Sequence, residues 1–172
     1  MGQIENLLID SSRAIADLTI TKINGKQESF DELVQIMLKN QYPVSMRAAR
    51  LVQLVGIKEY QLVQPHLDTF LLLLRTTHID GVKRSILKVI SEAPLTVNEE
   101  HWGELTDLCF DFVAVRNQAI AIRAFSADIL IKAIQIYPEL KPELIAVFET
   151  IWPDGSKGLK NKIKKLLVKL NK

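Results

Sequence analysis

A sequence block recurs four times in this 172-residue chain, and each copy contains an apolar residue followed directly by arginine or lysine. The four pairs are Met46-Arg47, Val82-Lys83, Ile122-Arg123 and Leu159-Lys160, so the basic residues lie 36, 40 and 37 positions apart. The position seven residues after the base is also apolar in every copy, and is occupied by Leu54, Ile90, Leu130 and Leu167. A period of this length is typical of stacked two-helix units and not of a catalytic motif.

Apolar residues at helical spacing, interrupted by proline and polar turn residues, divide the chain into helices. No segment shows sustained alternation of apolar and polar residues, so we predict no β-strands. The expected fold is all-α, an α–α superhelix of about four two-helix repeats. We place the repeats at about residues 29–59, 60–93, 98–137 and 139–171, after an N-terminal capping helix at 3–20 and a turn at Asn24-Gly25. We expect one domain over residues 1–172.

The recurrent apolar-basic pair early in each second helix resembles HEAT repeats, and an armadillo-like α-solenoid fits nearly as well. The family usually places aspartate six residues before the base. Here those positions hold Gln41, Thr77, Asn117 and Asp154, so only the fourth copy keeps the acid. The resemblance implies a binding scaffold, in which Arg47, Lys83, Arg123 and Lys160 form structural hydrogen bonds between repeats and do not bind a ligand.

Composition excludes several chemistries. Cys109 is the single cysteine, so neither an intrachain disulfide nor a cysteine-based metal cluster can form. His66, His78 and His101 lack the spacing of a metal site, and no glycine-rich phosphate loop occurs. We therefore expect no cofactor and no metal. No apolar run approaches the roughly 20 residues of a membrane span, and the N-terminus does not resemble a secretory signal. We expect a cytoplasmic, non-catalytic protein.

The distribution of charge is uneven along the chain. Residues 1–154 hold 15 basic and 20 acidic side chains, whereas the last 18 residues hold seven lysines and no acid. One interpretation is that the lysine-rich last helix attracts nucleic acid, an acidic protein or an anionic membrane. The other is that its apolar stripe joins the core while the lysines keep the end of the stack soluble. The second interpretation is favoured, and the absence of aromatic residues from this helix argues against binding of single-stranded nucleic acid.

The predicted function is a scaffold that binds another macromolecule, most readily a protein, through the second helices of the repeats. The candidate contact residues are Arg50, Arg84, Lys88, Lys162 and Lys165. Acidic residues of the third repeat form a second candidate surface: Glu99, Glu104, Asp107 and Asp111.

Three alternatives remain open at the level of sequence. The first is a nucleic-acid-associated protein that uses the basic C-terminal helix. The second is charge-driven self-association of the basic end with the acidic body. A remote third is an alkylated-base DNA glycosylase of HEAT-like fold, in which Trp102 and Asp107 would serve, although a spacing of five places them on different helix faces. No small-molecule substrate is evident.

Overall fold

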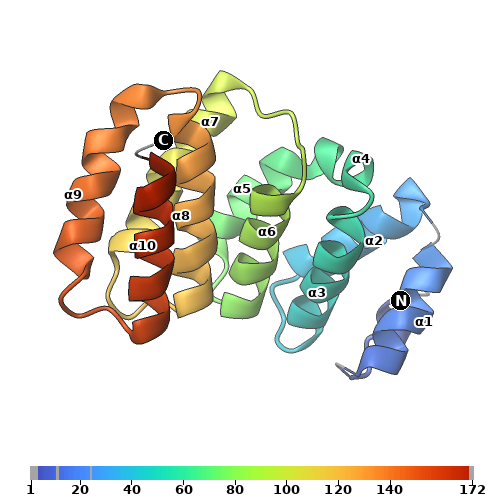
Figure 1. Cartoon of the computed structure of the whole chain (residues 1–172). Coiled ribbons are helices and arrows are strands. Elements are labelled where there is room, and N and C mark those ends of the chain that lie inside the picture. The colour runs from blue at the N-terminus through green and yellow to red at the C-terminus, as the bar shows by residue number, and fades with distance from the viewer. Residues whose placement is uncertain (1–3, 11, 24, 171–172) are drawn as a thin grey trace. The chain divides into compact units, whose positions relative to one another are not determined.

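The computed structural model describes residues 4–10, 12–23 and 25–170, and within them every regular element is helical. The described chain divides into two compact units, residues 1–96 and residues 97–172. The division falls after the second predicted repeat, in the segment that follows Pro94. Figure 1 shows the helices of each unit packed against one another in antiparallel pairs. Whether the chain behaves as one domain stays a prediction.

The first unit contains α1 (Arg13–Ile23), α2 (Gln27–Leu38), α3 (Val44–Gly56), α4 (Tyr60–Val63), α5 (Leu67–Thr76) and α6 (Asp80–Glu92). Helix α3 packs against α2 on one side and α6 on the other, so the second helices of two repeats lie side by side. The largest side chains that are completely buried in this unit are Ile23, Phe30, Leu33, Met37, Phe70, Leu74, Ile86 and Leu87. Burial of apolar surface between neighbouring pairs is the main source of stability in a stack of this kind.

The second unit contains α7 (Glu99–Ala114), α8 (Ile120–Ile134), α9 (Lys141–Ile151) and α10 (Lys157–Leu170). Helix α8 packs against both α7 and α10, and its buried residues are spread around the helix and not confined to one stripe. A helix that is apolar on most faces is a core helix. Helix α7 begins at Asn98, whose side-chain oxygen accepts a hydrogen bond from the backbone N–H of His101 at 2.7 Å, the cap that Asn followed by acidic residues indicates.

The N-terminal segment differs from the predicted helix over residues 3–20. A short 3₁₀ helix, η1 (Glu5–Leu7), comes first, and α1 begins only at Arg13. The break has a local cause, because Asp10 Oδ1 accepts a hydrogen bond from the backbone N–H of Ser12 at 2.6 Å. This side chain offers the backbone an alternative to the helical hydrogen bond. Residue 3, where the predicted helix begins, lies outside the described residues, as do Asn24 of the predicted turn and residue 171 at the end of the last predicted repeat. Gly25 has the positive φ of 69° that such a turn favours.

The second repeat, predicted over about residues 60–93, does not begin with one continuous helix. The chain forms the single turn α4, then a 3₁₀ turn η2 (Gln64–His66), and then α5. Pro65 explains the interruption, because proline has no N–H to donate and restricts the residue before it. The first repeat begins slightly earlier than the predicted residue 29, because α2 starts at Gln27.

A close approach between neighbouring repeats depends on a glycine. A Cβ atom added at Gly81, in the first turn of α6, would lie 2.4 Å from Cγ of Met46 on α3. We predict that Gly81→Ala lowers the free energy of unfolding by about 1–3 kcal/mol, because Met46 must be displaced from a packed interface.

The matched control is Gly103→Ala in the middle of α7, where an added Cβ meets nothing within 4 Å. Alanine is the better helix former, so this variant should gain about 0.5–1 kcal/mol. Chemical denaturation measures both changes, and a Gly81→Ala protein as stable as Gly103→Ala would refute the packing constraint.

Candidate functional site

Three of the four basic residues that define the sequence repeat donate hydrogen bonds to backbone carbonyl groups. Arg123 Nε donates to the carbonyl oxygen of Val113 at 3.0 Å, and Lys160 Nζ donates to that of Pro153 at 3.1 Å. Val113 lies in the last turn of α7, and Pro153 lies in the turn two residues after the end of α9. The last carbonyls of a helix have no partner within the helix, so Arg123 closes α7, whereas Lys160 holds the turn between α9 and α10.

Arg47 makes the same type of bond with a different partner. Its Nη1 donates to the carbonyl oxygen of Leu8 at 2.9 Å, and so holds the N-terminal segment against α3. Arg47, Arg123 and Lys160 therefore each make a contact within the fold, which supports the prediction that these residues stabilise it. None of these three contacts links two of the four repeats, in contrast to what the resemblance implied.

Polar pairs between turns link successive repeats instead. Thr77 Oγ1 donates to Asn40 Oδ1 at 2.6 Å, and Arg116 pairs with Asp154 through Nη2 and Oδ2. Thr77 and Asp154 stand six residues before the base of their repeats, at the position where the family has aspartate. Each contacts the residue directly before the corresponding position of the preceding repeat. The two pairs thus repeat the same geometry with different chemistry.

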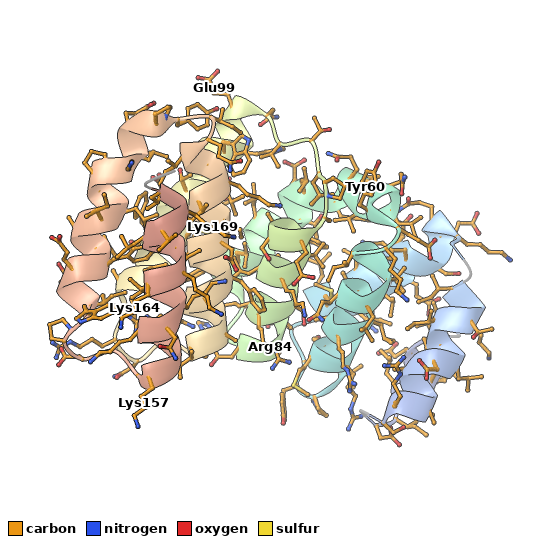
Figure 2. All side chains as sticks on the ribbon, in the orientation of Figure 1. Tyr60, Arg84, Glu99, Lys157, Lys164 and Lys169 are labelled. Carbon is orange, nitrogen blue, oxygen red and sulfur yellow. The ribbon has the colours of Figure 1, made fainter. Side chains whose placement is uncertain are left out.

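The predicted contact residues of the first unit lie on the adjacent helices α3 and α6. Arg84 is exposed on α6 and is labelled in Figure 2. Lys88 is half-buried, with its Nζ 3.8 Å from Glu92 Oε1 one turn further along the helix. Arg50 on α3 is also half-buried, and its side chain takes part in interactions within the fold. Arg84 is thus the most accessible of the three.

Lys162 and Lys165 occupy different environments on α10. Lys162 Nζ lies 2.6 Å from Asp128 Oδ2 on α8, and both side chains are less than a third exposed. This ion pair holds α10 against α8, so Lys162 is committed to the fold. Lys165 is exposed, as are Lys157, Lys164 and Lys169. Figure 2 labels the last three along α10. Lys172 lies outside the described residues.

The apolar stripe predicted for the last helix joins the core of the second unit. Leu159, Ile163 and Leu166 are buried, while Leu167 and Leu170 are half-buried. The sequence did not predict a cation–π contact beside this stripe, in which Lys164 Nζ lies 5.7 Å from the ring centroid of Trp152. Trp152 borders an apolar cleft of ≈ 180 Å³ between α9 and α10, together with Ile145, Phe148, Glu149, Ile163 and Leu167. No sequence signal ties a tryptophan at the end of one helix to a lysine in the next.

The remaining reactive side chains are held by the fold. Cys109 is completely buried, and burial raises the pKa of its thiol to about 12, although the neighbouring Ser126 hydroxyl acts to lower it. A thiol in this environment is a poor nucleophile at neutral pH. His66 contacts Asp31 Oδ1 through Nε2 at 2.6 Å, and its ring lies 5.8 Å from that of Phe30. Within the part of the chain that the structure describes, no group of three His, Cys, Asp or Glu residues is arranged to hold a metal ion.

The two residues considered for base excision do not share a cleft. Trp102 is half-buried and lines a cleft of ≈ 230 Å³ with Glu99, Gly103, Thr106, Tyr137, Glu139 and Leu140. Asp107 is exposed and does not line it. The two glutamates would repel nucleic-acid phosphates, so this cleft does not suit an extruded base.

The acidic residues considered as a second surface all lie on α7. Glu99, Asp107 and Asp111 are exposed, and Glu104 is half-buried and takes part in interactions within the fold.

Comparison with known families agrees with this arrangement of paired helices and capped turns. A family model described as a HEAT repeat domain matches residues 5–170. The chain therefore belongs to the HEAT repeat family, and the predicted all-α fold class is confirmed. Neither a curated protein nor a solved structure matches the chain. None of the helices in the described ranges is long and apolar enough to cross a membrane.

Proposed function

We propose that this HEAT repeat domain is a non-catalytic scaffold that binds an acidic surface of a partner protein through its second helices. The observation that carries the proposal is that some basic residues bind groups within the fold and others are exposed to solvent. Arg47, Arg123 and Lys160 are bound to backbone carbonyls, whereas Arg84 on α6 and Lys165 on α10 are exposed. Basic side chains that the fold does not use are available to an opposite charge on a partner.

The environment of the reactive groups supports a binding role over catalysis. Cys109 is buried in its protonated form, and His66 is engaged with Asp31 beneath Phe30. A nucleophile or general base needs access to substrate and a pKa suited to the working pH. The HEAT repeat family suggests a repeat scaffold and agrees with this interpretation.

Charge reversal at α6 tests the binding surface. We expect Arg84→Glu to weaken binding of a captured and identified partner by about tenfold, or 1.4 kcal/mol, because an attractive charge becomes repulsive. The thermal midpoint should change little, since exposed substitutions shift stability by about 0.5 kcal/mol or less. Isothermal titration calorimetry and thermal unfolding provide the two readouts.

Lys22→Glu is the matched control, because Lys22 is exposed on α1, which is not a second helix of a repeat. It makes the same reversal from a positive to a negative side chain and should leave the affinity within about twofold. Equal affinities for the wild type, Arg84→Glu and Lys22→Glu would remove α6 from the proposed surface.

Nucleic-acid binding is a second candidate, favoured by four exposed lysines on α10 and the absence of acidic residues from that helix. If α10 contacts phosphates, the logarithm of affinity should fall linearly with the logarithm of salt concentration, with a slope of about −0.9 per phosphate contacted on duplex DNA. Lys165→Gln combined with Lys169→Gln should reduce that slope. Fluorescence anisotropy with a labelled duplex measures it, and absence of binding at low salt would eliminate this candidate.

A further inference from the structure

A polar cleft opens in the second unit where α7 and α9 end. Its volume is ≈ 280 Å³, which exceeds by several times the roughly 30 Å³ that one water molecule occupies in the liquid. The residues that line it are Ala114, Arg116, Asn117, Arg123, Thr150, Ile151 and Asp154. The cleft is distinct from the α6 surface and from the apolar cleft beside Trp152, and neither the repeat pattern nor the family match assigns it a role.

Arg123 is the unusual member of this set. The residue is only 6% exposed, and burial lowers the pKa of its guanidinium group. A guanidinium group carries five N–H donors, and Nε uses one of them on the neutral carbonyl of Val113. Among the residues that the structure describes, no carboxylate forms an ion pair with it. A guanidinium group that is partly withdrawn from water at the wall of a cleft and has no counter-charge favours an anion.

The carboxylate that does line the cleft is already engaged. Asp154 is paired with Arg116, which leaves the positive charge of Arg123 uncompensated. The third and fourth repeats of this chain also differ in charge at one position. Asp154 stands six residues before Lys160 in the fourth repeat, whereas the corresponding position of the third repeat, six before Arg123, is the neutral Asn117. The third repeat therefore has a buried base without the acid that the fourth repeat places in the same position.

We propose that this cleft binds a carboxylate group, which contacts Arg123 and receives a further hydrogen bond from the side-chain amide of Asn117. A planar carboxylate matches the planar donor fork of arginine. Two guanidinium groups and one carboxylate give the lining a net charge of +1, which one carboxylate neutralises. Asp154 would repel the second charge of a phosphate dianion. The carboxylate belongs either to a small free acid or to an acidic side chain of a peptide.

The chain offers a substitution that fills the site from within. Asn117→Asp places a carboxylate on the lining of the cleft and should raise the thermal midpoint, because it supplies the missing charge to Arg123. The same change should weaken carboxylate binding about tenfold or more, since the added charge competes for the guanidinium group. Asn161→Asp is the matched control, because Asn161 is exposed on α10 and does not line the cleft.

The experiment follows the Arg123 Nε–Hε resonance by NMR during titration of the full-length protein. Sodium acetate is the first probe, with sodium chloride at equal ionic strength as reference. The second is an acetylated, amidated Gly-Glu-Gly peptide, with Gly-Gln-Gly beside it. Inorganic phosphate is the third.

A saturable shift with acetate or with the Glu peptide, absent with chloride and the Gln peptide and weakened by Asn117→Asp alone, supports the site. Comparable affinities for acetate and the peptide identify a small-acid site, whereas tighter binding of the peptide identifies an acidic side chain. No saturable shift, an equal shift in Asn117→Asp, or tighter binding of phosphate than of either carboxylate would overturn the proposal. These outcomes do not depend on partner binding at α6, so each proposal can fail alone.

Discussion

The closure of the turn between the two helices of a repeat is the constraint on which the rest of this structure depends. Each second helix must begin where the first ends, and this leaves carbonyl groups at the end of the first helix that need donors. Arg123 donates to such a carbonyl in α7 and Lys160 donates to a carbonyl of the turn after α9, while Thr77 with Asn40 and Arg116 with Asp154 connect one turn to the next. These polar contacts fix the alignment of helices whose apolar packing would by itself tolerate sliding, because burial of aliphatic surface has no preferred direction.

This constraint also sorts the charged residues by role. A base that binds a carbonyl or an ion-pair partner in the fold is unavailable to a partner molecule, which is the case for Lys162 beside Asp128. Arg84 and Lys165 do not occupy the repeated basic position, and both side chains are exposed. Arg123 lies between these classes, since it closes α7 and yet lines an open cleft with one donor accounted for. In a fold that is held by repeated polar contacts, a base whose donors are not all used can become part of a binding site.

The repeat period made the fold class predictable, because helix pairs that cannot bury their own apolar stripe must stack. The burial of the apolar stripe on α10 followed from the same periodicity. Features set by local side-chain chemistry were missed, such as the late start of α1 after Asp10 captures the N–H of Ser12, and the interruption at Pro65. The contact of Lys164 with Trp152 and the cleft around Arg123 depend on how turns meet in space, which no spacing along the chain encodes. The candidate contact residues were named from charge and repeat position alone, and so Lys162 could not be distinguished from Lys165.

The account requires that the turn-to-turn pairs contribute energy and are not incidental neighbours. A double-mutant cycle on Thr77→Val and Asn40→Gly measures this most directly, because valine keeps the shape of threonine and glycine tolerates the positive φ of 50° at position 40. Chemical denaturation of the wild type, both single variants and the double variant gives the coupling free energy. A coupling of about 0.5–1.5 kcal/mol, the usual contribution of one hydrogen bond, is the predicted result. Strict additivity of the two substitutions would contradict the claim that these turns are held by their polar pairs.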